Sequence, residues 1–290
     1  MENQVIINIE TVINFIEENL DRKIDLETVA NANHYSKYHL HRMFTDTVGM
    51  TIHDYVGRRH LTEAAKLLVF SEKPIIEIAF ICGYESQQAF SAAFKSMYKF
   101  PPAEYRERQE FYPLQLRFSL HRKLLSDIQL SKENIRLAET SDIPSWIELV
   151  RLVIDGFPYL DETEYIHKLE LAIGAKQALI LKQEEITVGV MAFSNDTDSI
   201  EFMGIHPQYR NRGVQKMFLD KLMEDYLPGR TISITTYRGK DRADTGYRKD
   251  LIQLGFAEKE LLIEFGYPTQ RFVLPPKDKE DNSNAKKITT

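Results

Sequence analysis

A short basic segment in the C-terminal half has residue types that bind phosphate. Residues 209–213 read Tyr-Arg-Asn-Arg-Gly, and they lie between a predicted strand that ends near His206 and a predicted helix. Unpaired backbone N–H groups and the positive dipole end of a helix N-terminus bind phosphate, and glycine lets a ligand approach the backbone closely. The segment is therefore a candidate pyrophosphate cradle, and the alternative is an ordinary capped turn with solvated arginines.

Polar and basic side chains also gather at the start of two predicted helices in the N-terminal half. Gln87 and Gln88 carry amides that can bond adenine bidentately, and Arg42 carries a guanidinium that can bond guanine or phosphate. For each side chain, a base contact, a phosphate contact and plain surface remain open. The candidate DNA contacts are Ser36, Lys37, Tyr38, His39, Arg42, Ser86, Gln87, Gln88, Ser91 and Lys95.

Capping residues predict the helices that carry these side chains. Asp25, Ser36 and Ser86 are good N-caps for helices over LETVANA, KYHLHRMFTDT and QQAFSAAFKSMY. Pro74 suits the first helical position of PIIEIAFIC, and Gly83 allows a turn with positive φ. Two such helix pairs form the layout of a double helix-turn-helix domain, whose recognition helices can enter major-groove turns about 34 Å apart.

One longer helix joins the two pairs. It covers TIHDYVGRRHLTEAAKLLVF, with Thr51 as its cap and Asp54 where a capping-box acid would lie. Residues 5–110 as a whole indicate helix, because apolar residues recur at spacings of three and four. The alternative to a DNA-binding domain is a helical bundle with solvated polar faces.

Composition limits what the chain can be. Its 290 residues suggest two domains. The net charge is −6, and residues 1–110 hold 12 Lys and Arg against 16 Asp and Glu, so DNA binding must depend on a few placed cations. The lone Cys82 excludes an internal disulfide and suits a reducing compartment. Without a secretory signal or a long apolar run, we expect a cytoplasmic protein that crosses no membrane.

The pattern changes in the second half of the chain. Strand-like runs such as QALILK, TVGVMAFS and TISITTY alternate with helices in the order β-α-α-β-β-β-α-β-α-β-β. We predict a multidomain chain with an all-α double helix-turn-helix domain followed by an α/β (α+β) domain with a central mixed sheet. The predicted boundaries are 5–110 for the first domain, 111–133 for a linker in which LQLRFSL alternates like a strand, 134–274 for the second domain and 275–290 for a disordered tail.

Three stretches of the N-terminal half carry a family resemblance. They are VANANHYSKYHLHRMFTDTVGMTIHDYV, HLTEAAKLL and IIEIAFICGYESQQAFSAAFKSMYKFPPAEYR. Over about residues 8–108 the chain resembles the DNA-binding domain of AraC/XylS-type regulators, which implies binding of specific double-stranded DNA. The departures are local: His60 replaces a usual Arg, His34 replaces the usual Gly of the first turn, and residues 99–102 replace a Gly-x-Ser/Thr-Pro stretch.

The C-terminal half carries a second resemblance. IRLAETSDIPSWIELV, GIHPQYRNRGVQKMFLDKL and LIQLGF resemble the first strand and helix, the acetyl-CoA motif and the last helix end of the GNAT acetyltransferase superfamily. The family motif ends in a small residue where this chain has Gln215, which could crowd the diphosphate. The resemblance implies an acetyl-CoA site formed by Ile205, Arg210, Asn211, Arg212, Gly213, Val214 and Gln215.

Two residues are candidates for acyl-transfer chemistry. Glu201, on the strand before the cradle, could act through water as a general base for an amine, or it is a solvated strand residue. Many GNAT enzymes place a Tyr four residues before a final Gly-Phe pair, where it protonates the leaving thiolate. That position holds Leu251 in this chain, and Tyr247, one helical turn earlier, could substitute.

Three functions remain compatible with these observations. The GNAT-like domain senses a ligand, such as acetyl-CoA or a small amine, for a transcription regulator; or the protein is a bifunctional DNA-binding N-acetyltransferase of a small amine or lysine; or the second domain only mediates dimerisation into a homodimer. We expect no metal cofactor, because the five histidines between residues 34 and 60 are not spaced like a metal site.

Overall fold

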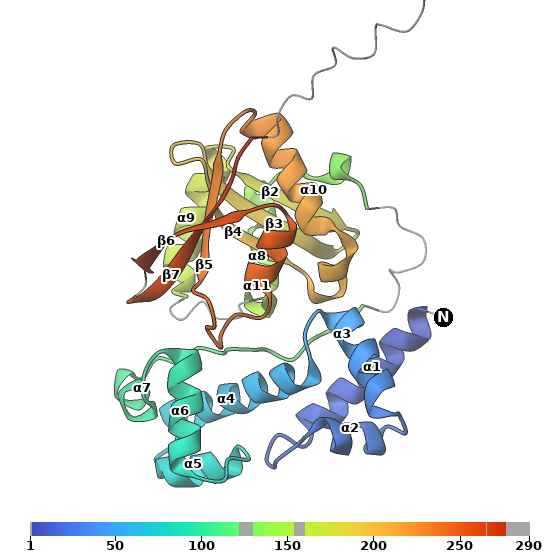
Figure 1. Cartoon of the computed structure of the whole chain (residues 1–290), viewed down its shortest axis with the longest axis vertical. Coiled ribbons are helices and arrows are strands. Elements are labelled where there is room, and N and C mark those ends of the chain that lie inside the picture. Colours follow the sequence, from blue (N-terminus) through green and yellow to red (C-terminus); the bar gives the residue numbers. More distant parts are fainter. Residues whose placement is uncertain (1, 122–129, 154–159, 265, 277–290) are drawn as a thin grey trace, which may run out of the picture.

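The computed structural model describes residues 2–121, 130–153, 160–264 and 266–276. An all-helical region comes first and a domain built on a mixed sheet follows it (Figure 1), as predicted. The order of helices and strands in the second domain also matches the prediction. Most of the predicted disordered tail, residues 277–290, lies outside the described residues. Among the described residues, no helix is long and apolar enough to cross a membrane.

The helical region contains two helix-turn-helix pairs joined by α4. Its helices are α1 (Glu2–Glu17), α2 (Leu26–Ala32), α3 (Lys37–Val48), α4 (Ile52–Phe70), α5 (Ile75–Ile81), α6 (Gln87–Tyr98) and α7 (Pro102–Arg108). The predicted caps are confirmed, because the side chains of Asp25, Ser36, Thr51 and Ser86 each accept a hydrogen bond from the backbone N–H three residues later. Pro74 lies one residue before α5 rather than at its first position.

Each helix-turn-helix pair has its own hydrophobic core. The first core is built from α1, α2, α3 and the start of α4, and the second from the rest of α4 with α5, α6 and α7. The segment after α7 completes both: Leu114 is buried in the second core, and Phe118 and Leu120 in the first. The strand-like alternation of this segment therefore reflects burial of alternate side chains, since its described residues, through residue 121, form no strand.

The second domain is a seven-stranded sheet in the order β1-β2-β3-β4-β5-β7-β6. Among the described strands, β4 and β5 alone pair in parallel, and the other neighbours are antiparallel. The strands are β1 (Arg136–Leu137), β2 (Ala178–Gln183), β3 (Ile186–Ser194), β4 (Ser199–Ile205), β5 (Ile232–Tyr237), β6 (Ala257–Glu264) and β7 (Tyr267–Leu274). The helices are α8 (Ile143–Val153), α9 (Glu162–Gly174), α10 (Val214–Lys221) and α11 (Tyr247–Gln253).

Helices cover both faces of this sheet. Successive side chains of a strand point to opposite faces, so Leu179 packs in the core that includes Phe218 of α10, whereas Ile180 packs with Trp146 of α8. Burial on both faces explains why β2 and β3 read as nearly continuous apolar runs. The 3-10 segment η3 (Pro207–Arg212) then carries the chain from β4 into α10.

Candidate DNA interface and ligand pocket

The two helices predicted to read DNA are built alike. Ser36 caps α3 by accepting from the His39 N–H at 3.3 Å, and Ser86 caps α6 by accepting from the Ala89 N–H at 3.1 Å. Each hydroxyl satisfies a backbone donor that lacks an intrahelical partner. These two serines therefore serve first to fix the helix starts that carry the neighbouring side chains.

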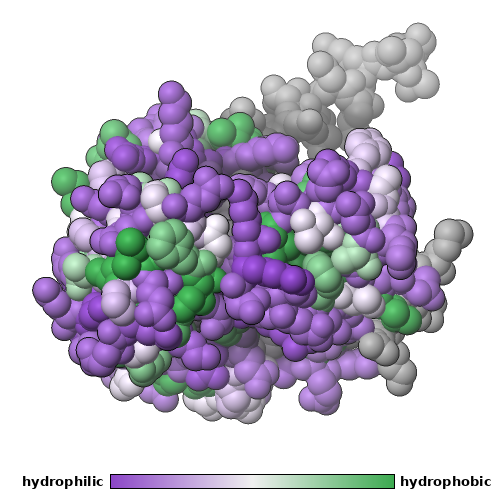
Figure 2. All heavy atoms as spheres, turned by 90° about the horizontal axis from the view of Figure 1, so that it is seen from below, coloured by the Kyte–Doolittle hydropathy of each residue, from purple (hydrophilic) through white to green (hydrophobic). Residues whose placement is uncertain are grey.

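The structure places the predicted DNA contacts on the outer faces of α3 and α6. Ser86 and Ser91 are half-buried. The remaining candidates are exposed: Ser36, Lys37, Tyr38, His39, Arg42, Gln87, Gln88 and Lys95. The face of the helical region turned away from the sheet domain is mostly hydrophilic, with a hydrophobic cluster on the side where α5 lies (Figure 2). Ile76 and Phe80 of α5 are exposed large hydrophobic residues.

The basic side chains among these candidates differ in the neighbours that they contact. The Lys37 ammonium lies 2.7 Å from a carboxylate oxygen of Glu27, so its charge is partly neutralised at the surface. The Arg42 guanidinium lies 5.8 Å from the centre of the Tyr38 ring, which is within reach of a cation–π contact. Lys95 forms no ion pair with any residue in the described part of the chain. Its exposed charge is therefore not neutralised by a neighbouring carboxylate of the described residues.

The turns of the two pairs share one geometry. His34 has φ +59° and Gly83 has φ +78°, and the two turns make the same backbone hydrogen bonds. The departure at His34 thus places an L-residue in the left-handed region, which histidine tolerates better than most residues. Gly83 also touches the first unit, because a Cβ built on it would lie 3.0 Å from the Cα of Lys23.

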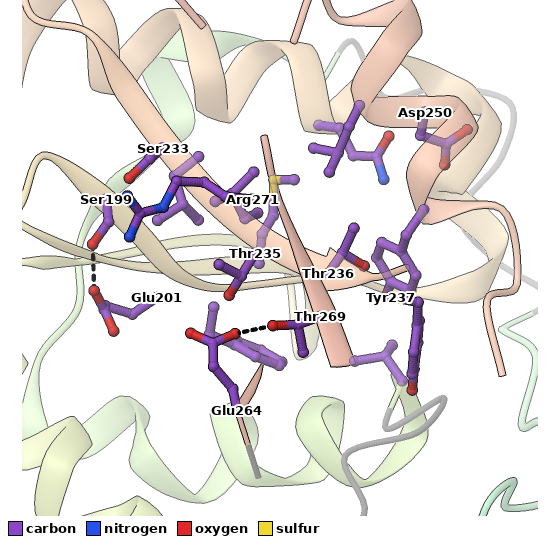
Figure 3. A pocket seen from close by; sticks show the side chains of 18 of the residues that line it. Ser199, Glu201, Ser233, Thr235, Thr236, Tyr237, Asp250, Glu264, Thr269 and Arg271 are labelled. Atoms are coloured by element: carbon purple, nitrogen blue, oxygen red, sulfur yellow. Dashed lines mark hydrogen bonds between the residues drawn. The ribbon is translucent and has the colours of Figure 1, made fainter. Parts of the chain in front are cut away.

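A pocket opens where the parallel strands part. β4 and β5 are paired only at Ser199–Ser233 and Ile200–Ile234, and beyond these residues they diverge. The pocket between them has a volume of about 450 Å³. Figure 3 shows polar side chains from several strands and from α11 around it, among them Glu201, Tyr237, Asp250, Glu264 and Arg271. Tyr247 and Tyr267 also line the pocket.

The pocket brings together the two candidates for acyl-transfer chemistry. Glu201 of β4 and Tyr247 of α11 both line it, and Leu251 is buried in its wall. Ser199 donates a hydrogen bond to Glu201. The Asp250 carboxyl accepts a hydrogen bond from Gln215, yet burial raises the pKa of Asp250 above its usual range. The hydrogen bond between Gln215 and Asp250 connects α10 to α11 across the edge of the pocket. Glu201 and Asp250 give the pocket an acidic lining.

The hairpin of β6 and β7 adds residues that the sequence did not single out. Glu264 accepts a hydrogen bond from Thr269 Oγ1 at 2.6 Å, and Arg271 pairs with Glu260 at 2.9 Å. Tyr267 contributes an aromatic wall. No sequence signal identified these residues, because they reach the pocket only through the insertion of β7 between β5 and β6.

The side chains of the predicted pyrophosphate cradle point in two directions, some toward solvent and others toward the end of α3. Gly213 has φ +72°, and a Cβ built on it would meet nothing within 4 Å, so the backbone there is open to a ligand. Arg212 is exposed. In contrast, Arg210 packs against Gly49, and the Asn211 amide donates to backbone carbonyls at the end of α3.

The remaining residues of the predicted acetyl-CoA site lie in the hydrophobic core or at the edge of the pocket. The side chains of Ile205 and Val214 are buried, so only their backbone groups could meet a ligand. Gln215 lies beside the pocket, where it bonds Asp250. The residues present fit a diphosphate through the backbone after Gly213 and the charge of Arg212.

Comparison with known proteins identifies the helical region. A family model described as a helix-turn-helix domain matches residues 29–108. The regulator YbfP of Bacillus subtilis is 41% identical over 98 residues, which cover 34% of this chain and 33% of YbfP. MarA of Escherichia coli is 39% identical over 100 residues, which cover 34% of this chain and 79% of MarA. The chain belongs to the AraC-type helix-turn-helix family.

The AraC-type domain accounts for the helical region alone. This chain spans about a third of the length of YbfP. Among solved structures, a GNAT-family acetyltransferase from Bacillus cereus is similar to part of this chain, with 17% identity, a TM-score of 0.39 and coverage of 49% of this chain and 96% of that one. The sheet domain must therefore be interpreted from its own pocket and cradle.

Proposed function

We propose that this AraC-type protein is a sequence-specific DNA-binding regulator of transcription that reads two successive major-groove turns with α3 and α6. The observation that carries the proposal is the pair of equivalent helices, each capped by a serine and each exposing polar and basic side chains. The relatives support it, because YbfP is described as an HTH-type transcriptional regulator. Double-stranded DNA is the proposed partner.

The test is selection of DNA followed by a salt titration. The 290-residue chain is used to enrich duplexes from a random library, and the affinity for an enriched duplex is measured by fluorescence anisotropy at several salt concentrations. We expect Lys95→Ala to reduce the slope of log K against log salt by about 1, since one phosphate contact is lost. Lys216→Ala is the matched control, because this exposed lysine pairs with Asp220 on α10.

Two outcomes would count against this picture. An unchanged slope in Lys95→Ala would remove that side chain from the phosphate contacts. Failure of the 290-residue chain to enrich any duplex would refute the proposed function of the helical region.

We further propose that the sheet domain binds a small ligand in its pocket and acetyl-CoA at its cradle. Three carboxyl side chains and several tyrosine rings line the pocket, and its arginine is already paired, which favours an amine or another cation. Arg212 and the backbone after Gly213 would hold the diphosphate. When bound, acetyl-CoA would supply an activated acetyl group.

A sensor and an enzyme differ in what the pocket residues do once the ligand is bound. In an N-acetyltransferase, Glu201 would remove a proton from the amine through water, and Tyr247 would donate a proton to the departing thiolate. In a sensor, the same residues would only bind and orient the ligand. Buried Leu251, at the position where many GNAT enzymes have tyrosine, favours the sensor.

Calorimetry and a thiol assay separate these roles. Binding of acetyl-CoA without release of free thiol across a panel of amines would support the sensor. Sustained thiol release, abolished in Glu201→Gln, would establish the N-acetyltransferase. If acetyl-CoA does not bind, the ligand-binding proposal fails and a dimerisation role, checked by light scattering, takes its place.

A further inference from the structure

The sheet domain touches both recognition helices at the same place, their C-terminal ends. Gly49 is the C-cap of α3 and Lys99 is the C-cap of α6, and both have left-handed backbone conformations. A different loop of the sheet domain reaches each cap: η3 meets α3, and the loop between β5 and α11 extends toward α6 (Figure 1). Two remote loops thus converge on equivalent points of one DNA-binding domain.

At the end of α3, η3 supplies both a hydrogen-bond donor and a close packing contact. Carbonyls in the last turn of a helix have few intrahelical donors, although the Thr45 carbonyl already accepts from the Gly49 N–H at 2.9 Å. Asn211 Nδ2 lies 3.4 Å from the Thr45 carbonyl oxygen and 3.3 Å from that of Asp46. Beside it, a Cβ built on Gly49 would lie 2.7 Å from the Cδ of Arg210. The backbone of α3 therefore sits directly against η3, and a larger residue at the cap would have to displace the Arg210 side chain.

At the end of α6, the contact is an ion pair surrounded by rings. Lys99 Nζ lies 2.7 Å from Asp241 Oδ1, and the two side chains are only 15% and 8% exposed. The same ammonium lies 5.6 Å from the centre of the Tyr237 ring and 5.5 Å from that of Tyr267. It also donates to the Ser96 carbonyl at 3.0 Å. A largely desolvated cation held by so many partners has little freedom to move.

A third contact lies between these two, on the helix that joins the pairs. Arg58 of α4 is buried, and its Nη2 donates to the carbonyl oxygen of Ala243. Ala243 is itself buried in the core of the second helix-turn-helix pair. The sheet domain therefore spans the helical region from α3 through α4 to α6.

We propose that Asn211 and Asp241 are positioning residues for DNA recognition, and that the sheet domain acts as a clamp that fixes the separation of α3 and α6. The proposal rests on the proposed DNA-binding function. The clamp holds the C-terminal ends, whereas eight of the ten candidate DNA contacts remain exposed in its presence, and Ser86 and Ser91 are half-buried. Two linked reading units bind a two-part site tightly only if their geometry suits both halves, and fixing that geometry in advance lowers the entropy lost on binding.

The first experiment measures the separation without DNA. Nitroxide labels are placed at the exposed positions His41→Cys and Ala92→Cys in a Cys82→Ala background, since Cys82 is the chain's single cysteine. Pulsed electron resonance then gives the distance distribution between α3 and α6. We expect a narrow distribution in this background and a broader one when Asn211→Ala and Asp241→Asn are added. An unchanged distribution would overturn the clamp.

The second experiment measures recognition. It uses a duplex enriched by the unaltered protein, the same duplex with one base pair inserted between its half-sites, and a single half-site. We expect Asn211→Ala with Asp241→Asn to bind the paired site about tenfold more weakly, to bind the single half-site as before, and to lose less affinity on the insertion. Equal loss on all three duplexes would mean that the variant only destabilises the domain, and would overturn the proposal.

Controls separate the clamp from folding and from the proposed function. Because Asp241→Asn alone leaves a largely buried ammonium unpaired, a second variant combines it with Lys99→Gln and must give the same broadening. Asp198→Asn, which removes the Arg230 pair elsewhere in the sheet domain, must leave both readouts unchanged. If no duplex is enriched but the label distribution still broadens, the DNA-binding function fails while the clamp stands.

Discussion

Loss of one buried carboxylate should weaken the helical region more than any surface charge. Glu17 of α1 receives hydrogen bonds from Tyr55 at 2.7 Å and from two nitrogens of Arg59 at 2.8 and 2.7 Å. The Arg59 and Glu17 side chains are 9% and 14% exposed. Removing one partner of a buried ion pair costs about 3–5 kcal/mol. In Glu17→Gln, however, Glu63 and the Gln115 carbonyl still contact Arg59 at 3.1 Å.

We therefore expect Glu17→Gln to lower the free energy of unfolding by about 2–3 kcal/mol. Urea unfolding followed by far-UV circular dichroism measures the loss, and the fluorescence of Trp146, the only tryptophan, reports the sheet domain separately. Glu104→Gln is the control: it breaks an exposed pair with Arg108 and should cost less than about 0.5 kcal/mol. Equal losses in the two variants would refute the reasoning.

Two further variants probe backbone strain and burial. Gly83→Ala should lower the free energy of unfolding by about 2 kcal/mol, because it strains a positive φ and meets the backbone of Lys23; Gly229→Ala, at φ +71° with nothing within 4 Å, should lose only about half as much, and equal losses would contradict the contact. Burial, and then the nearby His121, lower the pKa of His206 to about 3, so its contribution to stability is complete above the unfolded value near 6.5 and is lost as the pH falls toward 3. Between pH 7 and 5 the unaltered protein should lose about 1–2 kcal/mol more than His206→Gln in urea titrations, and parallel pH profiles would exclude this role.

The features that sequence predicted correctly are those set by neighbouring residues. Ser36 and Ser86 cap their helices because a serine hydroxyl can reach the N–H three residues later whatever the rest of the fold does. The positive φ at Gly83 follows in the same way from the absence of a Cβ. The order of strands and helices in the sheet domain was likewise carried by local periodicity.

The features that sequence did not reveal depend on contacts between distant residues. Nothing in the residues around Asn211 indicates that its amide faces α3 instead of the cradle, since Asp46 is its partner across 165 positions. Glu264 enters the pocket only because β7 lies between β5 and β6. The alternation around Phe118 predicted a strand as one option, but burial of alternate side chains in an extended segment gives the same pattern as a ladder.

The wall between the pocket and the DNA-binding domain is shared. Tyr237 and Tyr267 line the pocket on one side and surround the Lys99 ammonium on the other. Thermodynamic linkage is reciprocal, so any pocket ligand that changes the affinity for DNA has its own affinity changed by DNA through the same factor. On the proposed function, an occupied operator is thus itself an effector of the pocket, and molecules of this protein on and off DNA would respond to different ligand concentrations.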